Sequence, residues 1–564
     1  MRVAVTQFAT SLNVQENLAT CIRMIAEAAT CKPSLIVLPE YSNTQPNCVD
    51  HHQAWEHALT VDGEFLQAIA EQAIKHDCYI VINVTLQKNT SQLKNNANIS
   101  VTSCLFSPQG ELIHQVDKQA LAGRECNFLI GDSDDAEVVT TTFGKLSLLT
   151  DSANFKEART LALSGTQLLC QSLSTFSLDE SNLHGPTRAC ENNVFLAQAN
   201  KIGALTENND NEHEYFNGSG QSQIVSPTGL VLAKMASTEE GYVFADIDLS
   251  ACDDSKKIRP DGTKLSKQRR PELYQKLSEQ LNTVVETNEV PETANTAIFA
   301  TYKSNEEAIE DVCHYIENNL SDITQLPELF FVADKSITHN SEQLAEIERL
   351  SKQLIVQVSA MLRPFQYVCT SLVLDGTHQA VIISEQGVFA TQQQLHFCQR
   401  YLWTALGNDV NIIELPLEQG NISVAMLTAD DANIPEIVNA AALKNIHLLL
   451  VPFDIQEPCE VDYSLLSRAA EHRICIVAAS REISFKAEPV VDTNVQNTGN
   501  KKKVKAKKSI GFIANLSKNF VMPTPKNSIR FDGYINKPLV KSQHGKITKA
   551  LIFPVAACSK SPTK

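Results

Sequence analysis

The 564-residue sequence predicts an α/β protein that contains two tandem copies of one domain. The tripeptide Leu-Pro-Glu occurs at 38–40 and again at 326–328, and each glutamate lies 23 residues after an asparagine, Asn17 or Asn305. Short apolar runs alternate with segments of helical period in both halves, which is typical of the α/β class. A repeat this long favours two whole domains over a solenoid of short units, and the chain length agrees.

Later landmarks repeat in the same order. The sequence Arg-Ala-Cys-Glu at 188–191 is matched by Arg-Ala-Ala-Glu at 468–471, and Phe-Lys-Glu at 155–157 is matched by Ile-Pro-Glu at 434–436. The offset between copies is 288 residues at the first landmark and 279 or 280 at these two. The second copy is therefore shorter by a few residues in between.

Each copy begins with a strand, a helix and a second strand. Residues 1–6 favour a strand, residues 18–29 place apolar side chains at helical spacing, and 34–38 form a short apolar run. In the second copy, 297–300 and then 309–320 show the same order. Further strands are predicted at 79–84, 99–106 and 112–116. Ser-Pro-Gln-Gly at 107–110 and Ser-Pro-Thr-Gly at 226–229 predict hairpin turns.

The domain boundaries follow from these patterns. We expect a first domain over residues 1–249, a polar linker or arm over 250–294, and a second domain over 295–557. The second domain carries a lysine-rich insertion near 497–508, with six lysines from Lys501 to Lys508. Like charges repel and bury no apolar surface, so this run favours a solvated excursion; the alternatives are self-association or docking of an acidic partner or nucleic acid.

Composition limits the possible partners. The formal net charge of -17 disfavours general affinity for nucleic acid or anionic lipid, and small neutral or cationic ligands remain open. No apolar run reaches the roughly 20 residues of a membrane helix, and the first residues predict a strand, so a cytoplasmic location is expected. The 15 cysteines are scattered without Cys-x-x-Cys pairs. We therefore expect reduced thiols, no metal and no cofactor.

Several motifs together resemble the carbon-nitrogen hydrolases of the nitrilase superfamily. Over residues 1 to about 275 the resemblance rests on Glu40, Val-Asp-Lys at 116–118, Arg-Glu at 124–125, Gly144, residues 155–159, Gly165, and the segments 188–192, 199–203, 218–222 and 269–274. Residues 295 to about 557 resemble the family more faintly, through Glu328, Gly387, Pro-Glu at 435–436 and residues 468–471. The resemblance implies a four-layer αββα sandwich for each copy.

The same resemblance implies roles for particular residues. In that family a glutamate is the general base, a lysine stabilises the tetrahedral intermediate, and a cysteine forms a thioester with the acyl group of an amide or nitrile. Glu40 matches the base, Lys118 matches the lysine, and Glu125 matches a second glutamate that positions substrate. The cysteine is missing, because its place, seven residues before Glu157, is taken by Thr150.

The second copy departs further from the family pattern. Counting back from Glu436 gives Ala429, and aligning the apolar strand gives Thr428, so no cysteine falls there. The stretch that matches the lysine reads Thr-Gln-Gln-Gln-Leu at 391–395. Glu328 alone survives of the three, and the resemblance predicts a catalytically dead second site. Nitrilase-like domains commonly pair, so we expect the copies to form an intramolecular pseudo-dimer.

Three hypotheses for function follow. The first is a pseudoenzyme whose Glu40, Lys118 and Glu125 bind a small amide, carbamoyl compound or carboxylate without turnover. The second is a divergent amidase or carbamoylase that uses Thr150, Ser152 or a displaced cysteine such as Cys126. A hydroxyl is far harder to ionise than a thiol, so this option needs a dedicated base. The third is a structural scaffold for another protein.

Overall fold

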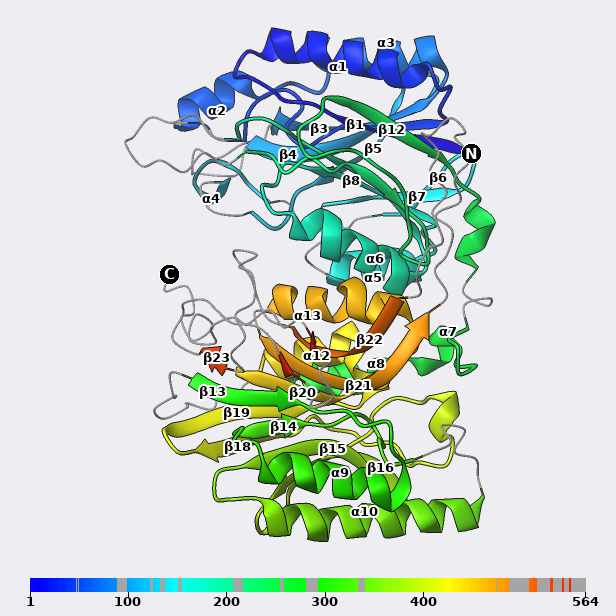
Figure 1. The fold of residues 1–564 in the computed structure, drawn as a ribbon. Coiled ribbons are helices and arrows are strands. Elements are labelled where there is room, and N and C mark those ends of the chain that lie inside the picture. Colours follow the sequence, from blue (N-terminus) through cyan, green and yellow to red (C-terminus); the bar gives the residue numbers. More distant parts are fainter. Residues whose placement is uncertain are drawn as a thin grey trace, which may run out of the picture. The chain divides into compact units, whose positions relative to one another are not determined.

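The computed structural model describes residues 1–46, 48, 50–88, 99–121, 125–131, 137–150, 155–205, 217–253, 258–279, 293–332, 340–472, 474–485, 507–514, 528–530, 540–541 and 547–548. The chain divides into two compact units (Figure 1). The described residues up to 253 form the first unit, and the described residues from 258 onward form the second.

Two six-stranded sheets form the first unit. The first sheet has the order β12-β1-β2-β3-β4-β5, with β1 (Arg2–Gln7), β2 (Leu35–Val37), β3 (Tyr79–Gln87), β4 (Ile99–Phe106), β5 (Leu112–Asp117) and β12 (Gly241–Asp246). The second has the order β11-β10-β9-β8-β7-β6, with β6 (Val139–Thr140), β7 (Lys145–Leu149), β8 (Leu168–Leu173), β9 (Phe195–Asn200), β10 (Gln223–Val225) and β11 (Val231–Lys234).

Helices of the first unit include α1, α3, α5 and α6, which cover the outer faces of these sheets. Their bounds are α1 (Val14–Ala29), α2 (His51–His57), α3 (Glu64–His76), α4 (Glu125–Phe128), α5 (Phe155–Leu163), η1 (Glu180–His184), α6 (Gly185–Asn192) and η2 (Leu249–Cys252). Figure 1 shows α1 and α3 on one side of the unit and α5 and α6 on the other. Separate apolar clusters lie under α1 and α3, between the two sheets, and under α5 and α6. The unit is therefore a four-layer αββα sandwich.

The start of the first unit illustrates why these elements form. Helix α1 begins after Asn13, whose side chain caps it by accepting hydrogen bonds from two backbone N–H groups. Leu18, Cys21 and Ile25 lie on its buried face at the predicted helical spacing. The two predicted hairpins are confirmed, since β4 pairs antiparallel with β5 and β10 pairs antiparallel with β11.

The second unit also contains two main sheets. One has the order β17-β16-β15-β14-β13-β23, with β13 (Thr293–Ile298), β14 (Ile323–Gln325), β15 (Tyr367–Leu374), β16 (Thr377–Ser384), β17 (Gly387–Gln393) and β23 (Ser528–Arg530). The other has the order β18-β19-β20-β21-β22, with β18 (Ile412–Leu417), β19 (Gly420–Met426), β20 (Leu448–Pro452), β21 (Cys475–Phe485) and β22 (Lys507–Ala514). A small sheet pairs β24 (Val540–Lys541) with β25 (Ile547–Thr548).

Helices again flank both sheets of this unit. They are α7 (Leu265–Gln268), α8 (Pro271–Glu279), α9 (Asn305–Glu317), α10 (Ser341–Met361), η3 (Gln399–Tyr401), α11 (Ala429–Ala432), α12 (Pro435–Ala442), η4 (Glu460–Ser464) and α13 (Leu465–His472). One apolar cluster lies under α9 and α10, one lies between the sheets, and one lies under α12 and α13. In Figure 1, α9 and α10 lie on one side of the sheets and α12 and α13 on the other.

The pairing pattern is the same in both units. In the first sheet of each unit, two parallel pairings are followed by two antiparallel ones, from β1 to β5 and from β13 to β17. In the other sheet, two parallel pairings lie between antiparallel ones, from β6 to β10 and from β18 to β22.

The structure describes part of the expected linker, part of the lysine run and the length of the helices. Within the expected linker 250–294, helix α8 packs into the second unit, where Leu273 and Leu277 are buried in its core. The lysine run is not a single excursion, because Lys507 and Lys508 begin β22 and pair with β21; Lys501 to Lys503 and Lys505 lie outside the described residues. None of the helices in the described part of the chain has the length and apolar character to cross a membrane.

Candidate functional site

Glu40 lies in the loop that follows β2, at the carboxyl end of a buried parallel strand. Its backbone N–H donates to the carbonyl of Leu173 at the end of β8 (3.2 Å), which ties this loop to the second sheet. The hydroxyl of Ser174 donates to Glu40 Oε2 at 2.6 Å. Glu40 is 6% exposed. The carboxylate is therefore held between the two sheets.

Lys118 lies directly after β5 and joins the two glutamates that the sequence singled out. Its Nζ lies 3.0 Å from Glu40 Oε1 and 2.9 Å from Glu125 Oε1. Glu125 is the first residue of α4 and also accepts a hydrogen bond from the Tyr41 hydroxyl at 2.6 Å. The structure thus brings Glu40, Lys118 and Glu125 together, with Tyr41 as a fourth member.

Charge holds this trio together. Burial by itself lowers the pKa of Lys118, but the carboxylates of Glu40 and Glu125 outweigh it and raise this pKa above its ordinary value. The side chain therefore stays an ammonium throughout the physiological range. A cation in this position can stabilise a negative oxygen on a bound ligand.

Lys201 is a further site residue; it lies in segment 199–203 of the family resemblance, which implied no role for it. It follows β9, is 1% exposed, and its Nζ donates to the carbonyls of Tyr41 and Thr44 at 2.8 Å each and to the Thr10 hydroxyl. Tyr41 has a left-handed φ of 53°, which a tyrosine rarely adopts. Lys201 therefore clamps the loop that carries both Glu40 and Tyr41.

Burial lowers the pKa of Lys201 to about 7. Its three acceptors match the three N–H donors of an ammonium, so the hydrogen-bond geometry favours the charged form. Lys201 is therefore a lysine whose hydrogen bonds favour the ammonium form but which, because of its burial, loses its proton more easily than an exposed lysine.

Thr150, at the position of the missing cysteine, is engaged with Glu157. It follows β7, its N–H donates to Glu157 Oε1 at 2.9 Å, and its hydroxyl donates to Glu157 Oε2 at 2.8 Å. Among the described residues, Thr150 makes no hydrogen bond to Glu40 or Lys118. Thr150 is therefore hydrogen-bonded to Glu157 of α5 and takes no part in the hydrogen bonds that join Glu40, Lys118 and Glu125.

The two other candidate nucleophiles are Ser152 and Cys126. Ser152 lies outside the described residues. Cys126 follows Glu125 on α4, is exposed, and its thiol donates to the carbonyl of Leu121 at 3.5 Å.

A small pocket adjoins the trio, with Tyr41 and Glu125 in its lining. Its lining is Tyr41, Thr44, Gln45, Pro46, Cys48, Ala54, Thr85, Ile99, Glu125, Phe128 and Leu129. Part of the pocket wall is apolar, and Tyr41 and Glu125 contribute polar groups to the rest of the wall. Gln45 is 8% exposed, and its Oε1 has no hydrogen-bond partner among the described residues.

In the second unit, Glu328 keeps its predicted place but has different neighbours. Its backbone N–H donates to the carbonyl of Phe453 at 3.1 Å, as Glu40 does to Leu173. Its carboxylate contacts Arg400 at 3.1 Å and accepts from the Tyr401 hydroxyl at 3.0 Å. Burial raises the pKa of Glu328 to about 7. No short motif at 391–401 indicated that Arg400 would reach this site.

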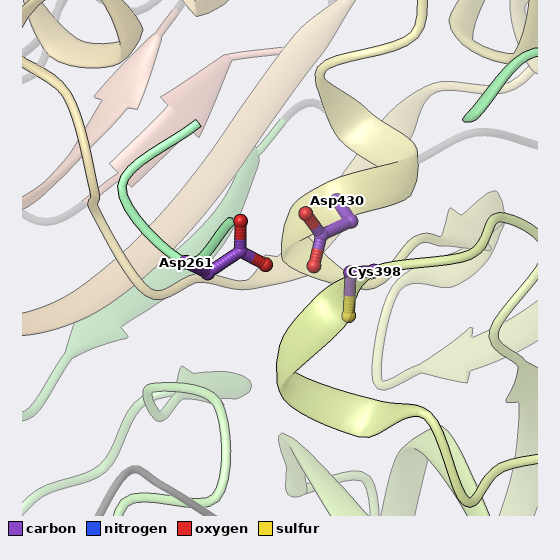
Figure 2. Close-up of side chains that lie close together, drawn as sticks. All are labelled: Asp261, Cys398 and Asp430. Carbon is purple, nitrogen blue, oxygen red and sulfur yellow. The ribbon is translucent and has the colours of Figure 1, made fainter. Parts of the chain in front are cut away.

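Asp261, Cys398 and Asp430 are residue types that can bind a metal ion. One ligand atom from each lies within 4.8 Å of the others, and Figure 2 shows their side chains close together from three different segments. Arg400 lies 2.7 Å from Asp430 Oδ2 and 3.8 Å from Asp261 Oδ2, and Arg259 lies 3.7 Å from Asp430. Arg400 and Arg259 are already the cationic partners of these carboxylates, so we assign the cluster to an ion-pair network and not to a metal site.

Comparison with known proteins agrees with the resemblance in the first half of the chain. The carbon-nitrogen hydrolase family model matches residues 2–257. A protein of Schizosaccharomyces pombe named as a probable nitrilase is 27% identical over 272 residues, which cover 47% of this chain and 93% of that protein. The omega-amidases of Danio rerio and Homo sapiens are each 27% identical over 287 residues, covering 48% of this chain and 96% of theirs.

Among solved structures, an amidase of the nitrilase superfamily from Nesterenkonia aligns with a TM-score of 0.38 and 22% identity, covering 49% of this chain and 96% of that chain. Residues 2–257 of this protein are thus similar to carbon-nitrogen hydrolases.

Proposed function

We propose that the first unit is a pseudoenzyme that binds a small amide, carbamoyl compound or carboxylate and does not turn it over by a thioester route. The observation that carries this proposal is the state of the catalytic positions. Glu40, Lys118 and Glu125 are in contact within 3.0 Å, whereas the nucleophile position holds Thr150. A hydroxyl forms no thioester and is far harder to ionise than a thiol.

The pocket beside the trio supports ligand binding. Buried polar atoms in proteins are nearly always hydrogen-bonded, so the unpartnered Oε1 of Gln45 favours an occupant with an N–H or O–H donor. The apolar wall that includes Ala54, Ile99 and Phe128 suits a short aliphatic group. Amides and carbamoyl compounds have such donors, and the omega-amidases named above are relatives whose name indicates amide substrates.

Ligand titration tests binding. Propionamide, propylurea and propionate should be added separately to the full chain while thermal unfolding is followed. A ligand that binds the folded state at 100 times its Kd stabilises it by about 2.7 kcal/mol. We expect a rise in Tm with at least one of the three, its loss in Gln45→Met, and its retention in Gln67→Met, an exposed glutamine of α3. No rise with any of the three would refute the binding proposal.

The nucleophile is tested by restoring it. We expect no ammonia release from amides by the natural protein, because loss of a covalent nucleophile costs about a million-fold in rate. Thr150→Cys should be alkylated by iodoacetamide faster than the exposed Cys126, if Lys118 and Glu40 promote the thiolate. A Thr150→Cys variant that reacts no faster than Cys126 would show that the site no longer activates a nucleophile.

A divergent hydrolase is the second candidate, and one observation favours it. The hydroxyl of Thr150 donates to Glu157 at 2.8 Å, which is the geometry of a hydroxyl beside a carboxylate base. Glu157 also accepts from the Thr150 N–H, so the same contact serves as a structural cap of the loop. Ammonia release by the natural protein that is lost in Thr150→Ala and in Glu157→Gln would favour this candidate. A scaffold role is the third candidate and predicts neither binding nor turnover.

We also infer that the two units arose by tandem duplication and that they pair as an intramolecular pseudo-dimer. The repeated motifs, the equal order of strand pairings and the equivalent backbone contacts of Glu40 and Glu328 support the duplication. The pairing is tested by small-angle scattering of the full chain, since a paired arrangement has a smaller radius of gyration than two linked but separate units. A scattering curve of separate units would refute the pairing.

A further inference from the structure

A buried guanidinium lies among the carboxylates of the second unit. Arg400 lies on η3, and its side chain is 9% exposed. Its Nη1 lies 3.1 Å from Glu328 Oε2 and 2.6 Å from Asp454 Oδ2, and its Nη2 lies 2.7 Å from Asp430 Oδ2. The three carboxylates come from three segments: the loop after β14, the loop after β20, and α11. Arg400 therefore joins three parts of this unit through one planar group.

Arg400 contacts Glu328 as Lys118 contacts Glu40 in the first unit, but the two cations lie at different positions in the repeat. Strand β17 occupies the place of β5 in the sheet order, and Lys118 follows β5. No lysine follows β17, and the guanidinium of Arg400, seven residues beyond Gln393, contacts Glu328 instead. The backbone N–H of Ala429 donates to Glu328 Oε1 at 3.3 Å. Ala429 and Thr428 are the two residues that the sequence offers as counterparts of Thr150.

The second unit has more carboxylates than cations at this place. Arg400 and Arg259 are the two guanidinium groups, and they contact the five acidic residues Asp261, Glu328, Asp430, Asp454 and Glu460. All five side chains are at most 5% exposed. Asp430 Oδ1 has no hydrogen-bond partner among the described residues. A cluster so rich in buried carboxyl groups requires cationic partners, and among the described residues Arg400 makes most of these contacts.

We propose that the second unit contains a guanidinium-binding site that its own Arg400 occupies, so that this unit takes no external ligand while Arg400 stays in place. Carboxylates that approach different N–H groups of one planar fork favour a guanidinium or amidinium ion over a compact ammonium. Tyr401 supports the same choice, since its ring lies 4.9 Å from the Arg400 guanidinium carbon.

Chemical rescue tests the site. Arg400→Ala in the full chain removes the occupant and leaves the carboxylates, so we expect a lower Tm than in the natural protein. Guanidinium chloride at about 10 mM should then raise the Tm of Arg400→Ala in proportion to ln(1 + [L]/Kd). Methylammonium chloride at equal ionic strength and urea at equal concentration should not. The natural protein, whose site is filled, should show no such rise.

Arg349→Ala is the matched control, because Arg349 also pairs with two carboxylates, Glu306 and Glu346, but on the surface. We expect no guanidinium-specific rise in that variant. If Arg400→Ala does not fold, its folded yield after dilution from urea should increase when about 10 mM guanidinium is present. Equal effects of guanidinium and methylammonium on Arg400→Ala, or no effect of either on its Tm and yield, would overturn the proposal.

Discussion

Replacing Lys118 by methionine leaves two buried carboxylates without the ammonium that lies between them. The side chain of Lys118 is 17% exposed, and those of Glu40 and Glu125 are 8% and 13% exposed, so water replaces the lost cation poorly. At 3.0 Å and an effective dielectric constant of about 20, one such charge pair is worth about 5 kcal/mol before desolvation. We expect a net loss of about 3–5 kcal/mol in the free energy of unfolding.

Each unit contains one tryptophan, so unfolding of the first unit can be followed separately by fluorescence. Trp55 lies in the first unit and Trp403 in the second, so Trp403→Phe gives a background in which fluorescence reports the first unit alone. Urea unfolding of Lys118→Met in this background at pH 7.5 should give the loss stated above. The matched control is Arg23→Met, since Arg23 also pairs with two glutamates but its side chain is 47% exposed.

We expect Arg23→Met to cost about 0–1 kcal/mol, as exposed ion pairs do. Equal costs for the two variants would refute the argument that burial makes the Lys118 contacts strong.

Two further predictions concern pH. Burial lowers the pKa of Lys201 from 10.5 to about 7, so the unfolded chain binds more protons than the folded chain between about pH 7 and 10.5. The stability due to this group therefore rises with pH across that window. Lys201→Met should flatten this rise when urea unfolding is measured at pH 7 and 9.5. Burial raises the pKa of Glu328 from 4.5 to about 7, so its contribution is fully present below about pH 4.5 and is lost as the pH rises through 7. Between pH 5 and 8, the Tm of Glu328→Gln should therefore fall less than the Tm of the natural protein. An equal fall in Tm for the two proteins would contradict this.

The elements of secondary structure could be predicted because their signals are local. Apolar side chains at helical spacing predicted α1, and Ser-Pro-x-Gly turns predicted the hairpins after β4 and β10. The resemblance added the trio, whose members lie 78 and 7 residues apart along the chain (Glu40 to Lys118 and Lys118 to Glu125) and are in contact in the structure. Long-range contacts of this kind are not visible in a local pattern.

The residues that sequence reasoning missed are buried charges. A lysine or arginine in a sequence is ordinarily taken as solvated, because these side chains are rarely fully buried. Lys201 and Arg400 break that rule, and both depend on acceptors far away in the chain: Thr10 for Lys201 and Glu328 for Arg400. The buried face of α8 was also missed, since Leu273 and Leu277 are too few to indicate where a short helix packs.

The retention of Glu40, Lys118 and Glu125 has two physical explanations, and one variant separates them. Removing any single member of a buried ion network is costly, so stability alone can keep all three in place after catalysis is lost. Replacing the trio by neutral groups of similar shape, in Glu40→Gln, Lys118→Met and Glu125→Gln combined, removes every unpaired charge at once. We expect this triple variant to be within about 1–2 kcal/mol of the natural protein in urea unfolding, because buried ion pairs replaced as a whole are often neutral in stability. If it is that stable and no longer shows the ligand-induced rise in Tm, stability does not explain the retained charges and ligand binding does. If it is stable and the ligand-induced rise persists, the pocket binds its ligand without these charges, and the first unit's site is maintained by the cost of losing its members one at a time.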